Sequence, residues 1–372
     1  MTNVGRRGTI GVALICACAL LAVPAAATAQ DPPDPGSTQS FTYGTGSLSN
    51  PYIVYTPTTY NSRRPAPLFV MVHGCQTSAY QQMRANLINH LAERAGFIVL
   101  YPDVDATHNL QPGPTVNCWR FPDPTSWMRG GGDAAAIAGM TQAVMGMRNI
   151  DRERVYLSGM SAGGFMTSIL AAAYPDLYAA VAIAAGGAYG DSSCLFGLPG
   201  GLSAEQSAGL AFDQMGARAR VVPILVMGGD ADAAVSPACA NKALEQGLRT
   251  DNLVLDGSQT APISLTPVAN THGQKPGGYS YSVSSYFYPA GCLIAQRWLI
   301  HGMNHFWPGG SADPQWANWT DPKAPSGADA AWGFVSRFRR SATGGRCAAD
   351  RPRRPRVRRR HHHPHRGHRR GR

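Results

Sequence analysis

The chain has 372 residues, 44% of them hydrophobic, which is enough to bury the core of one large domain. Its formal net charge of +11 at pH 7 comes from the C-terminal end, because residues 351–372 hold eleven arginines and no acidic residue. The remainder of the chain is charge-neutral, which argues against a folded domain built to bind nucleic acid or another polyanion.

The N-terminus has the pattern of a secretory signal peptide. Two arginines precede an apolar stretch over residues 10–23, and small residues then lead to a cleavage site after Ala29. The alternative is a membrane anchor, but the stretch is shorter than the roughly 18–20 residues that a spanning helix needs. We therefore expect a secreted protein without a transmembrane segment, from which residues 1–29 are removed, and a flexible segment over residues 30–45.

From about residue 50, buried-strand patterns alternate with helical patterns. Strand patterns cover residues 52–57, 67–74, 97–103, 154–159, 179–187, 221–229 and 292–302. Helical patterns include residues 80–95, 131–148, 162–175 and 325–339, the second of them capped by Asp133. This alternation predicts an α/β fold, with a mostly parallel doubly wound sheet in one domain over residues 46–341. Residues 257–280 are interpreted as an irregular insertion.

A serine surrounded by glycines lies between a predicted strand and a predicted helix. The stretch Gly159-Met160-Ser161-Ala162-Gly163 is a G-x-S-x-G motif, typical of a nucleophile elbow that displays its serine at a sharp turn. The alternative is a glycine-rich helix start that serves tight packing alone. The position between strand and helix favours the elbow, so Ser161 is the predicted nucleophile.

A serine nucleophile needs a base and an acid, each on a loop after a later strand. His305 follows the strand pattern 292–302 in a glycine-rich loop and is the predicted base. Asp232 follows the strand pattern 221–229 and is the predicted acid, with Asp230 as its alternative.

Three other features bear on an ester substrate. The loop after the strand pattern 67–74 contains Cys75, whose backbone N–H and that of Ala162 are the predicted oxyanion hole. Trp119 and Trp307 are candidates for an apolar wall against the substrate, or else residues of the core. No metal or organic cofactor is implied by these motifs.

Six cysteines remain after the signal peptide, an even number that predicts three disulfides in an exported protein. Strand ends that share an edge of the sheet suggest how they pair. The expected pairs are Cys75–Cys118 and Cys194–Cys239 at the active-site edge, and Cys292–Cys347 at the opposite edge.

The motifs HGC, NCWRF, RGGGD, RVYLSGMSAGG, YPDLYAAVAIAAG and GMNHFWPGG occur in this order along the chain. Over about residues 50–340 the chain resembles the polyhydroxybutyrate depolymerase family of secreted esterases, as a catalytic domain without a polymer-binding domain. The resemblance implies an α/β-hydrolase fold, the triad Ser161, Asp232 and His305, and hydrolysis of short-chain polyhydroxyalkanoate. The family also covers feruloyl and acetylxylan esterases, which stay open as alternatives. A more distant alternative is a secreted polyanion-binding protein without catalysis.

The C-terminal residues 342–372 are rich in arginine and histidine and nearly free of apolar side chains. Such a composition cannot bury enough surface to fold, so we expect a disordered basic tail. It is either a solvated extension without a partner or an electrostatic contact with anionic polymers or the cell envelope.

Overall fold

The apolar runs of the sequence form the strands of one large sheet. The computed structural model describes residues 31–110, 116–195 and 200–342. Within these ranges ten strands are hydrogen-bonded in the order β1-β2-β4-β3-β5-β6-β7-β10-β9-β8. Their bounds are β1 Ser37–Tyr43, β2 Asn50–Thr56, β3 Ala66–Val72, β4 Ile98–Pro102, β5 Ile150–Met160, β6 Ala180–Ala184, β7 Ile224–Gly229, β8 Ala269–Gln274, β9 Ser280–Phe287 and β10 Leu293–Ile300. Two short strands, β11 (Trp307–Pro308) and β12 (Thr320–Asp321), pair with each other.

The centre of the sheet is parallel and its two ends are antiparallel. Neighbouring strands from β4 through β3, β5, β6 and β7 to β10 run parallel. Strands β1 and β2 on one side, and β8 and β9 on the other, add antiparallel pairs. The mostly parallel sheet that the sequence predicts is confirmed. Because parallel strands end at the same edge, the loops after β3, β5, β7 and β10 meet there.

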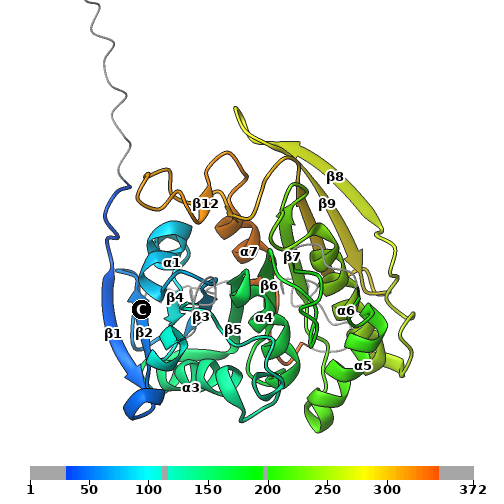
Figure 1. Ribbon diagram of the computed structural model, residues 1–372, viewed down its shortest axis with the longest axis horizontal. Coiled ribbons are helices and arrows are strands. Elements are labelled where there is room, and N and C mark those ends of the chain that lie inside the picture. The colour runs from blue at the N-terminus through cyan, green and yellow to red at the C-terminus, as the bar shows by residue number, and fades with distance from the viewer. Residues whose placement is uncertain (1–30, 111–115, 196–199, 343–372) are drawn as a thin grey trace, which may run out of the picture.

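Helices cover both faces of the sheet (Figure 1). Their bounds are α1 Ala79–Asn86, α2 Ile88–Ala95, α3 Gly132–Met147, α4 Ala162–Ala173, α5 Ala204–Met215, α6 Pro237–Asp256 and α7 Gly327–Val335, with short 3₁₀ turns at Gly46–Leu48, Ala106–Leu110, Pro124–Trp127 and Gly216–Arg218. Helices α3, α4, α5 and α6 share one hydrophobic core, whereas α1, α2 and α7 share another. Strand β3 supplies Leu68 and Val70 to the first core and Phe69 and Met71 to the second. Burial on both faces explains why the central strands read as continuous apolar runs.

Much of the second half of the expected flexible segment is instead a strand. Residues 37–43 form β1, whose partners in β2 run from Thr56 opposite Ser37 to Asn50 opposite Tyr43. The prediction over residues 30–45 is wrong for these positions, because β1 is an edge strand whose side chains are mostly exposed and so carry no burial pattern. The predicted signal peptide and most of the predicted tail lie outside the described residues.

Two predicted elements are divided or extended by the structure. The helix expected over residues 80–95 is split by Leu87, whose φ of 57° ends α1 before α2 begins. The insertion expected to be irregular over residues 257–280 contains β8, which pairs with β9. Strand β8 has no alternation of apolar and polar residues, because it is largely exposed at the edge of the sheet.

The start of α3 also differs from the prediction. Its N-cap is Gly131, and no side chain caps it. Asp133 lies in the first turn of the helix, and its carboxylate instead bonds residues of the neighbouring loops. The predicted cap is therefore wrong, although the helix itself is confirmed.

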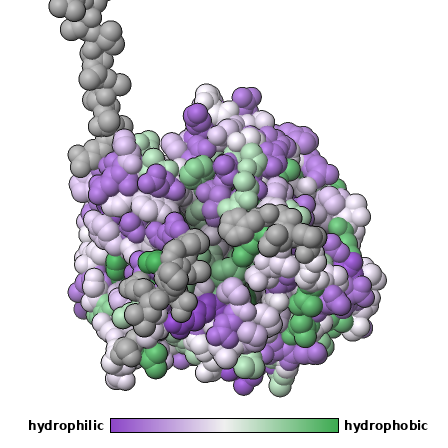
Figure 2. All heavy atoms as spheres, in the orientation of Figure 1, coloured by the Kyte–Doolittle hydropathy of each residue, from purple (hydrophilic) through white to green (hydrophobic). Residues whose placement is uncertain are grey.

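The surface seen in Figure 2 is mostly hydrophilic, with scattered hydrophobic residues. The large hydrophobic side chains that are exposed among the described residues are Tyr43, Leu48, Tyr80, Met128, Met147, Leu210 and Val268. Of the helices in the described part of the chain, none has both the length and the hydropathy needed to cross a membrane.

Candidate active site

Ser161 lies at a strained turn between β5 and α4. Its backbone has φ 56° and ψ −122°, a conformation that side-chain-bearing residues rarely adopt. A Cβ added to Gly159 would lie 2.1 Å from the carbonyl oxygen of Gly163, and one added to Gly163 would lie 2.2 Å from a carbonyl oxygen of β3. The glycines are therefore required by close approach of main chains, and the turn presents the serine hydroxyl at the edge of the sheet.

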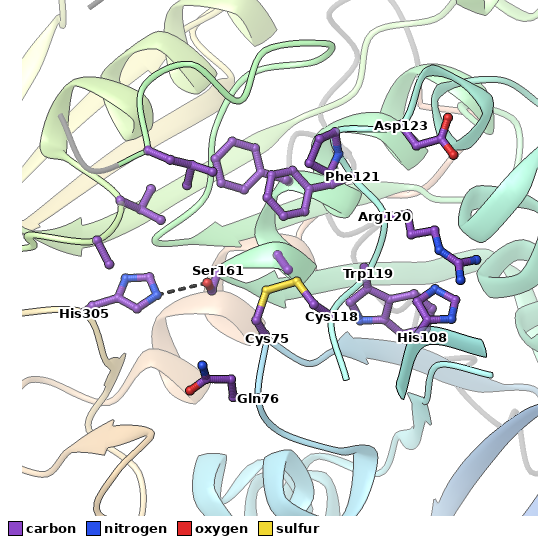
Figure 3. A pocket seen from close by; sticks show the side chains of 16 residues that line it. Cys75, Gln76, His108, Cys118, Trp119, Arg120, Phe121, Asp123, Ser161 and His305 are labelled. Atoms are coloured by element: carbon purple, nitrogen blue, oxygen red, sulfur yellow. Dashed lines mark hydrogen bonds between the residues drawn. A yellow bond between two sulfur atoms is a disulfide. The ribbon is translucent and has the colours of Figure 1, made fainter. Parts of the chain in front are cut away.

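Three residues from three loops form a continuous hydrogen-bonded chain. Nδ1 of His305, in the loop after β10, donates to Oδ2 of Asp232, in the loop after β7, over 2.8 Å. In a neutral imidazole this leaves Nε2 as the acceptor for the Ser161 hydroxyl, 3.0 Å away (Figure 3). The other carboxylate oxygen of Asp232 accepts the backbone N–H groups of Ala234 at 3.0 Å and Val235 at 2.8 Å. The structure thus brings together the nucleophile, base and acid that the sequence predicts.

Asp230, the alternative acid, is bonded to a different histidine. Its Oδ2 lies 2.8 Å from Nδ1 of His301, and its Oδ1 accepts the backbone N–H of Gly302 at 2.6 Å. Burial opposes ionisation, but the Gly302 N–H and then the imidazole lower the pKa of Asp230 below its ordinary value. Nε2 of His301 in turn contacts the hydroxyl of Ser282 on β9 at 2.8 Å. Asp230 therefore ties the acid loop to the base loop but does not contact His305.

Asn304 joins the same two loops a second time. Its side-chain oxygen accepts the backbone N–H of Ala233 at 3.2 Å and that of His305 at 2.8 Å. One residue thus holds the main chain beside the acid and the main chain of the base. The sequence does not indicate this role of Asn304, because its partner Ala233 is 71 residues away along the chain.

The predicted oxyanion donors lie beside Ser161. Cys75 and Ala162 both line the pocket that Ser161 and His305 share. Neither backbone N–H has a hydrogen-bond acceptor among the described residues, which leaves both able to bind a substrate oxygen. A Cβ at Gly74 would stand 3.1 Å from Cβ of Ser161, so glycine keeps this loop close to the nucleophile.

The pocket has a volume of about 590 Å³ and its lining is mainly apolar. Phe121 and Phe165 both line the pocket and stack with their ring centroids 4.5 Å apart. Phe121 lies above Ser161 in the view of Figure 3. The Cys75–Cys118 disulfide borders the same space (Figure 3). The other lining residues are Gln76, His108, Trp119, Arg120, Pro122, Asp123, Ala162, Leu195, Ala234 and Val235.

A buried ionic cluster supports the far wall of the pocket. Nδ1 of His108 lies 3.0 Å from Asp105 and Nε2 lies 3.0 Å from Asp133. Burial opposes protonation of the imidazole, but the bond to Asp133 and then that to Asp105 raise the pKa of His108 above its ordinary value. Asp133 also accepts the backbone N–H of Arg120 at 2.6 Å, next to Trp119 in the pocket wall. The sequence offered no signal for this cluster beyond the individual residue types.

The two tryptophans predicted for the substrate wall lie in different parts of the structure. Trp119 lines the pocket, although only 1% of its surface is exposed. Trp307 is fully buried in the core shared by α1, α2 and α7 and does not line the pocket. The prediction for Trp307 is therefore corrected: its large apolar ring fills the core on the face of the sheet opposite α4.

Two of the expected disulfides are present. The pairs are Cys75–Cys118 and Cys194–Cys239. The third expected pair, Cys292–Cys347, stays a prediction because Cys347 lies outside the described residues. Over the described ranges, no group of three or more His, Cys, Asp or Glu side chains is placed to hold a metal ion.

A family model described as "Esterase PHB depolymerase" matches residues 50–262 of the chain. Poly(3-hydroxyalkanoate) depolymerase C from Paucimonas lemoignei is 30% identical over 251 residues, which are 65% of this chain and 55% of that protein. Feruloyl esterase B from Neurospora crassa is 36% identical over 127 residues, which are 34% of this chain and 40% of that protein. The chain thus spans about half the length of the curated relatives that it matches.

A solved structure shares the fold. The acetyl xylan esterase from Aspergillus awamori superposes with a TM-score of 0.55 at 21% identity, covering 73% of this chain and 94% of that structure. Together with the parallel sheet and the strand–serine–helix turn, this likeness shows the α/β-hydrolase fold that the sequence predicts.

Proposed function

The chain belongs to the esterase PHB depolymerase family, and from this premise we propose that it is a serine esterase of short-chain polyhydroxyalkanoate, such as poly- or oligo-3-hydroxybutyrate. The observation that carries the proposal is the hydrogen-bonded chain from Ser161 through His305 to Asp232 at the wall of an apolar pocket. This arrangement supplies a nucleophile, a base that accepts its proton and an anion that orients the base.

In the first step, Oγ of Ser161 attacks the ester carbonyl carbon as Nε2 of His305 takes its proton. Asp232 holds the imidazole with Nδ1–H toward its carboxylate and stabilises the imidazolium that forms. The carbonyl π electrons move to oxygen, and the backbone N–H groups of Cys75 and Ala162 bind the resulting oxyanion. The C–O bond to the leaving alcohol then breaks, and His305 returns its proton to that alcohol.

In the second step, water replaces the alcohol. His305 removes a proton from the water as its oxygen attacks the acyl carbon, and then gives the proton to Oγ of Ser161 as the acyl–serine bond breaks. The products are the free acid and the restored serine. No step requires a group beyond these residues and water.

The pocket supports a substrate with a small apolar repeat. Phe121, Phe165, Leu195 and Val235 line the pocket together with Ser161 and give it apolar walls, which suit the methyl-bearing backbone of 3-hydroxybutyrate. The stacked rings of Phe121 and Phe165 favour a second candidate, an aromatic acyl group such as a feruloyl ester. The similarity to feruloyl and acetylxylan esterases keeps polysaccharide esters as the alternative substrates.

We further propose that the protein is secreted. Disulfides form and persist in oxidising compartments, and the described residues contain two. The predicted signal peptide over residues 1–29 would direct export. Mass spectrometry of the culture medium tests this, since it should detect a mature chain beginning after Ala29.

Kinetics on a substrate panel test the activity. We expect kcat/KM to be highest on 3-hydroxybutyrate oligomers, compared with feruloylated sugars, acetylated xylan and p-nitrophenyl acyl esters. Ser161→Ala should lower kcat by about 10⁴-fold or more while the far-UV circular dichroism spectrum stays unchanged. Wild-type turnover by the folded variant would refute the serine mechanism, and preference for a feruloyl or acetyl ester would refute the proposed substrate alone.

A further inference from the structure

A second cavity lies away from Ser161, between α6 and the antiparallel pair β9–β10. Its volume is about 340 Å³, within the range of small-molecule sites. It shares no lining residue with the pocket of Ser161. Leucines of α6, β10 and the loop before β8 form most of its apolar wall: Leu244, Leu248, Leu265 and Leu299.

Arg297 of β10 forms part of the cavity wall and is buried, with 6% of its surface exposed. Its Nε donates to the side-chain oxygen of Asn241 at 3.0 Å, and its Nη1 donates to the backbone carbonyl of Trp298. In the part of the chain that the structure describes, its Nη2 has no hydrogen-bond partner. Burial lowers the pKa of Arg297 to about 10, so the guanidinium is still charged at neutral pH.

The structure as described places no carboxylate against the Arg297 charge. Among the described residues, no Asp or Glu oxygen lies within 4.0 Å of the Arg297 guanidinium. The acidic residue in the cavity wall is Glu245, and it is held by Arg249 on the same helix, with Nη2 at 2.7 Å and Nε at 2.9 Å from the same oxygen. A buried cation without a counter-ion is costly, and such groups usually persist where an anion is bound.

From these contacts we propose that the cavity is a second binding site for a small monocarboxylate with a short aliphatic chain, paired with Arg297. A single guanidinium matches one negative charge, and carboxylates suit its planar donors. The leucine wall favours an aliphatic chain on the other side of the carboxylate. A phosphate or sulfate would instead place a second charge against leucine side chains, with no second cation to pair it.

The strand register adds polar groups beside the guanidinium. Ser284 of β9 is paired with Arg297, and Ser282 is paired with Leu299; both serines line the cavity. Their hydroxyls are bonded within the fold, Ser284 to Oδ1 of Asn270 at 2.7 Å and Ser282 to Nε2 of His301 at 2.8 Å, so the guanidinium is the group of this wall that pairs with the carboxylate. Among the described residues that line it, the site therefore offers the cation of Arg297 and an apolar wall, which is the composition expected for a short fatty acid anion.

Isothermal titration calorimetry of the full chain with sodium butyrate tests the proposal. We expect Arg297→Gln to weaken butyrate binding at least tenfold. The matched control, Arg218→Gln, removes an exposed arginine that lines neither this cavity nor the pocket of Ser161, and it should leave the affinity within twofold. Butyrate bound in the Ser161 pocket would contribute equally to all variants, so the difference between them reports on this cavity alone and does not depend on the esterase activity.

An uncharged probe, a doubly charged probe and a second variant complete the test. Butyramide, which has the same shape without the charge, should bind at least tenfold more weakly than butyrate, as should sulfate at equal ionic strength. Leu265→Trp, which fills the cavity from a loop, should weaken butyrate binding at least tenfold and decides the matter if Arg297→Gln does not fold. Undetectable butyrate binding to the wild type at 50 mM would overturn the proposal. So would equal affinity of butyramide or sulfate, or unchanged binding in the Arg297→Gln or Leu265→Trp variant.

Discussion

Replacing Asp232 by asparagine should invert the tautomer of the base. In the structure, Oδ1 of Asp232 accepts two backbone N–H groups, from Ala234 and Val235, while Oδ2 accepts Nδ1–H of His305. The amide of asparagine has one oxygen, and the two backbone donors hold that oxygen in place of Oδ1. The amide NH₂ must then face His305, so Nδ1 becomes the acceptor and the ring proton moves to Nε2. A protonated Nε2 cannot take the proton of Ser161.

The expected loss in rate is large. In a Ser–His–Asp enzyme, the same change of tautomer lowers kcat by about 10⁴-fold, which corresponds to about 5 kcal/mol of transition-state stabilisation. Folding should be nearly unaffected, because asparagine keeps the volume and the two backbone hydrogen bonds of the buried side chain. The ground-state affinity should also change little, since Asp232 does not line the pocket.

Asp230→Asn is the matched control, because Asp230 lies on the same loop and also bonds a histidine. It removes a charge without touching His305, so we expect less than a tenfold loss in kcat. The assay is hydrolysis of p-nitrophenyl butyrate from pH 5 to pH 9, with kcat and KM determined for both variants. A kcat of the Asp232→Asn variant within tenfold of wild type would refute the tautomer argument, and an exchange of the two results would identify Asp230 as the acid.

Three further predictions follow from the surroundings of the site. Gly163→Ala places a methyl group 2.2 Å from a carbonyl oxygen of β3 and should destabilise the protein by about 3 kcal/mol or more. Gly209→Ala in α5, where the added methyl group meets nothing within 4 Å, should stabilise the protein by about 0.5–1 kcal/mol. Urea unfolding of both variants measures the two changes. Replacing both Cys75 and Cys118 by serine opens a loop of 43 residues and should lower the free energy of unfolding by up to about 4 kcal/mol. Urea unfolding without reductant measures this loss, and an unchanged midpoint of unfolding would contradict it. Because the pKa of His108 is raised in the folded state, its stabilising contribution is present below its ordinary pKa and is lost as the pH rises through the raised value. Stability measured from pH 6 to pH 9 should therefore fall less steeply in His108→Gln, and identical slopes would contradict the assignment.

The sequence was sufficient for the central sheet and for the three loops that carry the hydrogen-bonded chain. The parallel strands are buried on both faces, so they appear as continuous apolar runs, and the end of each strand can be located in the sequence. The residues after β5, β7 and β10 could be assigned because strand order in a parallel sheet puts those loops at one edge. That topology also accounts for the Cys75–Cys118 and Cys194–Cys239 pairs.

Other elements left little trace in the sequence. Strands β1 and β8 are exposed at the edges, so their residues lack the burial pattern that marks a strand. The break at Leu87 is a single left-handed residue inside an otherwise regular helical pattern. Trp307 illustrates the same limit for side chains, since the type of residue suits a substrate wall or a core equally well.

What the sequence determined by itself is the order of strands and helices, and with it which loops carry Ser161, Asp232 and His305. Only the tertiary structure decided between Asp232 and Asp230, because the two carboxylates are two residues apart and differ only in which histidine each one reaches. The same holds for Asn304 and Arg297, whose roles depend on groups far away in the chain. Periodicity reports how one residue lies relative to its neighbours in sequence, whereas hydrogen bonds and buried charges depend on distances across the fold, which a single sequence does not encode locally.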